Sequence, residues 1–156
     1  MASRRNGFTL IEMLVTVVVL GILATIAIPS FTSLINNNRA DSETSDLYRT
    51  LNYARLEAIT RGVNVRVVPA TAGTWNGILN VYASADLTTV LRSVSAMSSK
   101  ATVTMSVSTA GYIEFNNLGA LNYPTAALTL AYTQGTATRN VSVCLNGRVI
   151  QSGTCS

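Results

Sequence analysis

A long apolar stretch near the N-terminus constrains this chain more than any other feature. Residues 8–28 carry a single charged side chain, that of Glu12. At a rise of about 1.5 Å per residue, a helix of this length is about 30 Å long and matches the hydrocarbon core of a bilayer. The sequence therefore predicts one membrane-spanning helix. Because Arg4 and Arg5 precede it and Arg39 is the first base after it, we expect a cytoplasmic N-terminus and an exported remainder.

Glu12 is the unusual residue of this stretch. An ionised group at membrane depth costs roughly 2.5–3.5 kcal/mol on insertion scales, so an acid at such a place indicates a function and requires a partner. The partner that we expect is another copy of such a chain.

The residues around Glu12 also resemble a known signal. A short basic leader ends in Gly7 and is followed by Phe8-Thr9-Leu10-Ile11-Glu12. This arrangement resembles the class III signal of type IV pilins and type II secretion pseudopilins. The resemblance implies that a membrane-embedded prepilin peptidase removes residues 1–7 by cutting between Gly7 and Phe8, and then N-methylates Phe8. It also implies that Glu12 interacts with the terminal amine of a neighbouring subunit as a filament grows.

Two plainer interpretations of this stretch are a secretory signal cut near residues 25–27 and a simple membrane anchor. The uninterrupted apolar run of residues 13–28 is longer than the usual apolar region of a secretory signal. An acidic residue at the start of that region is also unusual for such a signal. A simple anchor leaves both the Gly7–Phe8 junction and Glu12 unexplained.

A helical pattern continues beyond the membrane segment, over residues 29–62. Pro29 should bend or loosen the helix because it removes one backbone hydrogen bond. An apolar stripe at the spacing i, i+4, i+7, i+11 follows, formed by Leu47, Leu51, Ala54 and Ala58. Arg61 followed by Gly62 is typical of a helix end. We therefore expect an amphipathic extension that packs on the remainder of the chain.

Residues 63–156 are expected to form a β-rich domain. The expected strands are residues 63–68, 78–83, 90–94, 102–107, 112–115, 128–132, 140–145 and 148–151. Asn146-Gly147 predicts a two-residue turn between the last two strands, and Gln134-Gly135 lies in a looser connection before them. The expected fold class is α+β and pilin-like, with the long N-terminal helix packed against an antiparallel sheet.

Three further motifs narrow the resemblance to the FimT, FimU and GspH group of minor pilins and pseudopilins. They are a W-x-G-type strand entry that starts at Trp75, the segment Ile113-Glu114-Phe115-Asn116-Asn117-Leu118-Gly119, and a terminal strand and Gly-Arg hairpin that starts at Val141. The aromatic residues Trp75 and Phe115 are expected to pack in the core rather than to bind a ligand.

The only two cysteines, Cys144 and Cys155, are expected to form a disulfide because an exported domain meets an oxidising compartment. With a tight turn at Asn146-Gly147, Cys144 would face Val149. An extended strand would then carry Cys155 about 20 Å away, beyond disulfide reach. The tail must therefore bend back, and Ser152-Gly153 is where it can do so.

The C-terminal region also suggests weak binding of duplex DNA. No Asp or Glu follows Phe115, while Arg139 and Arg148 flank the terminal hairpin. Some FimT-like proteins bind DNA near this end through a Gly-Arg-x-Arg pattern. Here the sequence is Gly147-Arg148-Val149-Ile150, so the second arginine is absent, and Arg139 or Lys100 would have to replace it in space. Two or three phosphate contacts would give weak, salt-sensitive binding. The plainer interpretation is a pair of solvated arginines.

Composition argues against an enzyme. The chain has no histidine, and charged residues make up 12% of it. As a separate point, the formal net charge of +4 is too small to indicate a polyanion partner by itself. Asp86 and Glu114 are the only acids in the β-rich part, which is little material for a catalytic pair. We expect no catalytic residue, no metal site and no cofactor.

The function that we expect is that of a minor pilin of a type IV pilus, acting in assembly or priming at the tip. The alternatives are a DNA-binding minor pilin for DNA uptake and the H-type minor pseudopilin of a type II secretion system. The expected partners are other pilins or pseudopilins, the prepilin peptidase, the inner-membrane assembly platform, membrane lipid before assembly and, weakly, duplex DNA. The expected location is the bacterial inner membrane, with the C-terminal domain in the periplasm.

Overall fold

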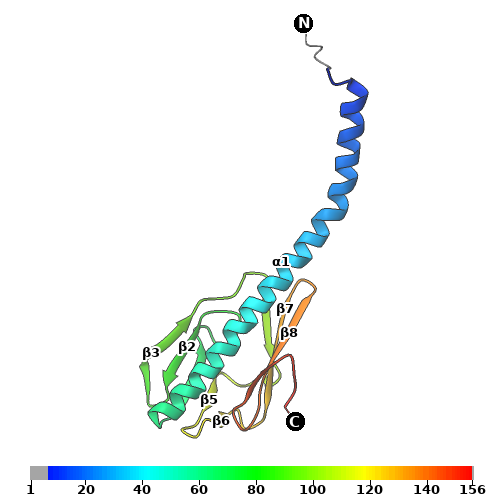
Figure 1. Cartoon of the computed structure of the whole chain (residues 1–156). Helices are drawn as coiled ribbons and strands as arrows, with labels where there is room; N and C mark the ends of the chain where they lie inside the picture. Colours follow the sequence, from blue (N-terminus) through cyan, green and yellow to red (C-terminus); the bar gives the residue numbers. More distant parts are fainter. Residues whose placement is uncertain (1–6, 156) are drawn as a thin grey trace. The chain divides into compact units, whose positions relative to one another are not determined.

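The computed structural model describes residues 7–155, apart from the side chains of residues 26–29. It consists of one long helix, α1 (Leu10–Arg61), and the strands β1 (Val65–Pro69), β2 (Leu79–Ala83), β3 (Asp86–Val94), β4 (Thr102–Met105), β5 (Ile113–Phe115), β6 (Leu121–Tyr123), β7 (Leu128–Gln134), β8 (Ala137–Val143) and β9 (Val149–Gln151) (Figure 1). The chain divides into two compact units, Met1–Ile35 and Asn36–Ser156.

In the first unit, Thr9 caps the start of α1. The backbone N–H of Glu12 donates to Thr9 Oγ1 at 3.3 Å, which satisfies one of the amides that have no partner at a helix N-terminus. The Thr16 hydroxyl donates to the carbonyl oxygen of Glu12 at 2.8 Å. The N–H of Glu12 and the hydroxyl of Thr16 thus both have hydrogen-bond partners close by in the chain. The helix also continues through Pro29 without interruption, and the bend expected there stays a prediction.

In the second unit, the predicted stripe of α1 is confirmed. Leu47, Leu51, Ala54 and Ala58 are at most 1% exposed, and they share a core with side chains from both sheets. The helix ends at Arg61, as expected, and Gly62 follows with φ of +67°. Glycine adopts this left-handed conformation without the steric cost of a Cβ atom.

The strands form two sheets, where the sequence predicted an antiparallel sheet without specifying its division. One sheet has the order β3-β2-β1-β5-β6 and the other the order β4-β7-β8-β9, and all strand pairs in the described residues are antiparallel. In Figure 1, β2 and β3 lie on one side of α1, and β7 and β8 lie on the other. The helix stripe is therefore buried by both sheets.

The largest differences from the predicted strands occur at turns. β3 begins at Asp86 and not at residue 90, because Ala83 pairs with Asp86 across a short turn. Gln134 pairs with Ala137, so Gln134-Gly135 lies in a tight hairpin and not in a loose connection. β6 was not predicted, since its short sequence Leu121-Asn122-Tyr123 carries little strand signal.

The Asn146-Gly147 turn differs by one residue. Val143 pairs with Val149, the N–H of Cys144 donates to the carbonyl of Arg148 at 2.9 Å, and the N–H of Gly147 donates to the carbonyl of Cys144 at 2.8 Å. Gly147 has φ of +77°, so three residues, rather than two, form the loop. Cys144 consequently faces Arg148, and the expectation that it faces Val149 was wrong.

Candidate functional site

The proposed processing site lies before the first turn of α1. Gly7 and Phe8 precede the helix, and Phe8 is 74% exposed. A Cβ atom added at Gly7 would meet no atom within 4 Å. The fold of this chain therefore does not itself require glycine at this position. The rest of the proposed leader, residues 1–6, lies outside the described residues.

The helix that follows presents apolar side chains outwards. Those at least 48% exposed between residues 10 and 23 include Leu10, Ile11, Met13, Leu14, Val15, Val17, Val18, Val19, Leu20, Ile22 and Leu23. Within the described residues, α1 is the one helix that is long and apolar enough to cross a membrane, and its most apolar window has a mean hydropathy of 2.6. Glu12 is exposed on the first turn of this surface.

Arg139 is engaged with α1. Its Nε lies 2.6 Å from Asp41 Oδ1, and one of its terminal nitrogens donates to the carbonyl of Thr138 at 2.9 Å. Arg139 shares a face of β8 with the buried Ala137 and Val141, so its side chain points to the helix side of the sheet. The hydrogen bond to Asp41 raises the pKa of Arg139 above its ordinary value.

The three candidate DNA-binding bases do not come together in the structure. Arg139 pairs with Tyr132 and Arg148 lies opposite Cys144, which places Arg148 about 17 Å further along the sheet. Lys100 precedes β4, whose first residue Thr102 pairs with Thr133, so it lies at the opposite end from Arg148. Arg148 alone remains as an exposed base on the terminal hairpin.

The disulfide between Cys144 and Cys155 is present, with a Cα separation of 5.3 Å. The tail reaches it by a bend at the expected position, where Ser152 has φ of +56°. The N–H of Ser152 donates to the carbonyl of Asn140 at 2.9 Å, and the Ser142 hydroxyl donates to the carbonyl of Gly153 at 2.7 Å. Since Cys144 also bonds Arg148, the disulfide fixes the loop that carries this arginine.

Sequence reasoning missed an ion pair on the first sheet, in which the side chain of Glu114 is 7% exposed and that of Arg66 is 22% exposed. Arg66 Nη2 lies 3.0 Å from Glu114 Oε2, Asn122 donates to the same carboxylate at 2.6 Å, and Ser84 donates to it as well. Burial alone would raise the pKa of Glu114, but the hydrogen bonds from Ser84 and Asn122 and the charge of Arg66 bring it below its ordinary value. Only the strand register, which places residue 66 opposite residue 114, could have revealed this pair.

A second polar cluster joins α1 to the other sheet. The hydroxyl of Tyr132 donates to Glu43 Oε2 at 2.7 Å, and the N–H of Ser98 donates to Glu43 Oε1 at 2.8 Å. Burial, together with the carboxylate of Glu43, raises the pKa of Tyr132 above its ordinary value. Glu43 therefore accepts hydrogen bonds without an ion-pair partner in the described part of the chain.

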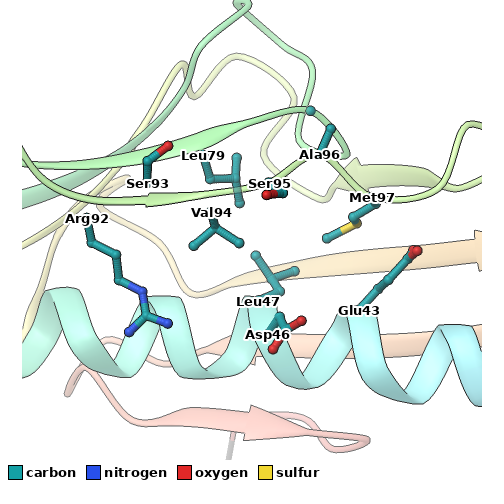
Figure 2. Close-up of a pocket in the computed structure, with 11 residues that line it drawn as sticks. Glu43, Asp46, Leu47, Leu79, Arg92, Ser93, Val94, Ser95, Ala96 and Met97 are labelled. Atoms are coloured by element: carbon teal, nitrogen blue, oxygen red, sulfur yellow. The ribbon is translucent and has the colours of Figure 1, made fainter.

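Glu43 also borders a groove of about 340 Å³. Figure 2 shows that Asp46 and Leu47 reach it from the helix, while Arg92 and the segment that ends at Met97 form its other wall. The carboxylate of Glu43 is committed to the cluster above, and Arg92 lies over the Tyr53 ring at 5.1 Å. No group of three metal-ligating side chains occurs in the described residues. The charged side chains that line the groove are thus engaged within the domain, since Asp46 also lies 3.6 Å from Arg49.

Comparison with known proteins agrees with this architecture. Residues 43–148 match the family described as Type II transport protein GspH, and residues 2–28 match the prokaryotic N-terminal methylation motif. No curated protein sequence matches the chain.

Two solved structures share the fold. The type IV minor pilin FimU of Pseudomonas aeruginosa has a TM-score of 0.66 and 22% identity, over 74% of this chain and 90% of that one. The minor pseudopilin EpsH of the Vibrio cholerae type 2 secretion system has a TM-score of 0.56 and 13% identity, over 72% of this chain and 95% of that one. Because the GspH match extends over more than half of the sequence, this chain belongs to the GspH family of type IV pilin-like proteins.

Proposed function

We propose that this chain is a minor pilin of a type IV pilus, similar to FimT and FimU, that acts in assembly or priming at the pilus tip. The observation that carries the proposal is the position of Glu12. It is the only charged residue between residues 6 and 38, and it lies in the first turn of a helix whose neighbouring side chains are apolar and exposed. The apolar stretch of this helix requires an apolar environment, and the carboxylate of Glu12 then requires a cationic partner.

The terminal amine of a neighbouring subunit meets that requirement. When the leader is removed, Phe8 becomes the N-terminus and carries a positive charge. Docking of this amine against Glu12 of an adjacent subunit would pair two charges that are costly to bury singly. A negative charge in the first turn is also favourable near the positive end of the helix dipole. Incorporation into the filament would thus be coupled to correct registration of neighbouring helices.

Removal of the leader is assigned to the prepilin peptidase, with Gly7 and Phe8 as its site. The match of residues 2–28 to the methylation motif supports this assignment. A Cβ atom at Gly7 would meet no atom within 4 Å, so a substitution there tests processing with little effect on the fold. The orientation, with Arg4 and Arg5 in the cytoplasm and the disulfide-closed domain in the periplasm, follows the charge bias and the redox chemistry of these compartments.

The substitutions Glu12→Val and Glu12→Gln test the proposal in the native bacterium. Both should leave membrane insertion intact, because each removes a charge from an apolar helix. Both should reduce the amount of the protein in sheared filaments, and the isosteric glutamine separates loss of charge from loss of shape. Fractionation into membranes and sheared filaments gives both quantities. Normal incorporation of both variants would remove the assembly role of Glu12.

The H-type pseudopilin of a type II secretion system is the alternative within the same family. The disulfide-closed tail favours the pilus group over this alternative. Deletion of the gene distinguishes the two, because loss of a minor pilin reduces surface pili, whereas loss of a pseudopilin reduces export of secreted enzymes. The genes that flank this one provide an independent answer.

DNA binding for uptake is a second candidate, and one observation favours it: Arg148 is exposed on a loop held by the disulfide. A single arginine supports only weak, sequence-independent contact with phosphates. Gel shifts at low and moderate salt with wild type and Arg148→Gln provide the test. Equal and negligible retardation of both would leave assembly as the function.

A further inference from the structure

Two loops of the second unit meet beside the end of α1. A Cβ atom on Gly147 would overlap the carbonyl oxygen of Gly119, so the β8–β9 loop and the β5–β6 loop are in direct contact. The same carbonyl accepts a hydrogen bond of 2.9 Å from Nε of Arg55 on α1. The N–H of Leu121 also donates to the carbonyl of Leu145 at 3.0 Å. The helix and both loops therefore converge at one place, which we call the Gly119 junction.

Hydrogen bonds hold the backbone of both loops. In the β5–β6 loop, the side-chain oxygen of Asn116 accepts from the N–H groups of Leu118 and Ala120 at 3.0 and 2.9 Å. In the β8–β9 loop, the N–H of Gly147 donates to the carbonyl of Cys144 at 2.8 Å, and the disulfide ties Cys144 to the tail. Side chains on these loops are therefore pre-organised, which lowers the entropy that binding a partner would cost.

Apolar side chains at the Gly119 junction are left in solvent. Leu118 is 80% exposed and Leu145 is 54% exposed. Ile59 of α1, whose side chain lies against Gly119, is 45% exposed. Burying a leucine completely gains about 1.5–3 kcal/mol, and these side chains forgo most or part of that gain. Apolar side chains gathered in this way on an ordered frame are typical of an interaction surface.

The Gly119 junction also carries a net positive charge. Arg55 uses one of its N–H donors there, and Arg148 is exposed at the end of the β8–β9 loop. Neither base forms an ion pair within the described residues. The acid closest to Arg55 along α1 is Glu57, which is paired with Arg61 and, two positions further on, lies on the opposite side of the helix. Residues 115–156 contain no Asp or Glu, so neither loop supplies a carboxylate.

We propose that the Gly119 junction is a docking surface for an acidic peptide segment of a partner protein, with apolar side chains next to its carboxylates. Its contact residues are Arg55, Ile59, Leu118, Leu145 and Arg148. Carboxylates match the two arginines, because a guanidinium pairs with a carboxylate through parallel hydrogen bonds. The exposed leucines favour a protein over duplex DNA, since contacts with a phosphate backbone come from basic and polar groups. The whole surface lies in the second unit, so it is independent of the role proposed for Glu12.

Fluorescence anisotropy of the full chain in detergent tests this surface, with micelles alone as the background. The probe is a labelled peptide of alternating leucine and glutamate. Two matched peptides carry glutamine in place of glutamate, or glycine in place of leucine. The leucine–glutamate peptide should bind most tightly, and its affinity should fall as salt rises. Arg148→Gln should weaken its binding about fivefold, the upper value for an exposed charge pair, and Leu118→Ser about tenfold through the lost apolar contact. Both side chains are exposed, so both variants should fold.

Arg49→Gln and Leu87→Ser are the matched controls. The Arg49 side chain is 70% exposed on α1, and Leu87 is 51% exposed on β3 of the other sheet. Both controls should bind the leucine–glutamate peptide as the wild type does. Failure of this peptide to bind, equal affinity for the leucine–glutamine peptide, or equal losses in the controls would overturn the docking surface. Tighter binding of labelled duplex DNA, weakened by Arg148→Gln but not by Leu118→Ser, would assign the bases to nucleic acid and also overturn it.

Discussion

Arg139 of β8 and Asp41 of α1 are 98 positions apart in the chain, yet the Nε of Arg139 lies 2.6 Å from the Asp41 carboxylate. The pair ties the four-stranded sheet to the start of the domain's helix. It also assigns Arg139 a structural contact, although the sequence made this residue a candidate for DNA binding. The side chains are 29% and 60% exposed, so solvent screens the attraction.

The substitution Arg139→Gln is therefore expected to lower the free energy of unfolding only slightly and to leave DNA binding unchanged. A partly exposed ion pair contributes about 0.2–1 kcal/mol. A double-mutant cycle with Asp41→Asn, measured by urea unfolding of the full chain in detergent at low and high salt, gives the coupling energy. The coupling should fall as salt rises. Weaker DNA retardation by Arg139→Gln than by wild type, with unfolding unchanged, would return Arg139 to the DNA-binding surface.

The lowered pKa of Glu114 predicts that the free energy of unfolding depends on pH. Its pKa is below the ordinary value of 4.5 in the folded chain, so the unfolded state binds more protons in acid. The stabilisation is fully present above about pH 4.5 and is lost as the pH falls through the folded-state pKa.

Glu114→Gln should flatten the decline in unfolding free energy between about pH 5 and pH 3. The control is Glu57→Gln, because Glu57 also has a lowered pKa but lies in a more exposed pair with Arg61 on the helix, with side chains that are 21% and 48% exposed. Its effect should be smaller, since solvent screens that pair. An equal or larger effect of the Glu57 variant would contradict the importance of the pair between Glu114 and Arg66.

Gly147 is expected to be intolerant of a side chain. A Cβ atom there would lie 1.7 Å from the carbonyl oxygen of Gly119, and φ is +77°. Gly73 has the same φ but no atom within 4 Å of such a Cβ. Gly73→Ala should therefore cost about 1 kcal/mol, for the backbone conformation alone, and Gly147→Ala should cost at least twice as much. Similar unfolding midpoints for the two variants would contradict the close approach of the two loops.

Loss of the disulfide should destabilise the domain. Cys144 and Cys155 are 11 residues apart, and closing a loop of that length contributes about 3 kcal/mol in the chain-entropy estimate. The Cys144→Ser/Cys155→Ser double variant should unfold at lower urea concentration than the oxidised wild type. It should match the reduced wild type, and a clear difference between these two would point to an effect of the substitutions themselves.

The sequence was most informative where one local pattern determines the structure. The stripe from Leu47 to Ala58 and the helix end at Arg61-Gly62 follow from helical spacing and from the conformational freedom of glycine. The disulfide followed from the presence of only two cysteines, and the bend at Ser152 from the need for their side chains to meet.

The contacts between residues far apart in the sequence could not be predicted, because they depend on the register between distant strands. Nothing local shows that Arg66 lies opposite Glu114 or that Arg139 reaches Asp41. The last turn was displaced by one residue because Gly147, with its positive φ, closes a three-residue loop whose sequence also fits a two-residue turn. The separation of Lys100 from Arg148 likewise depends on which strands are neighbours in the second sheet.

The N-terminus of the protein isolated from filaments tests the central claim most directly. Mass spectrometry of the protein from its native bacterium should give a chain that begins at Phe8 and carries one methyl group on the terminal nitrogen. The Gly7→Ala variant should remain uncleaved and stay in the membrane fraction, although the fold has room for the added methyl group. An intact Met1 terminus in assembled material would contradict the assignment of this chain as a processed pilin subunit.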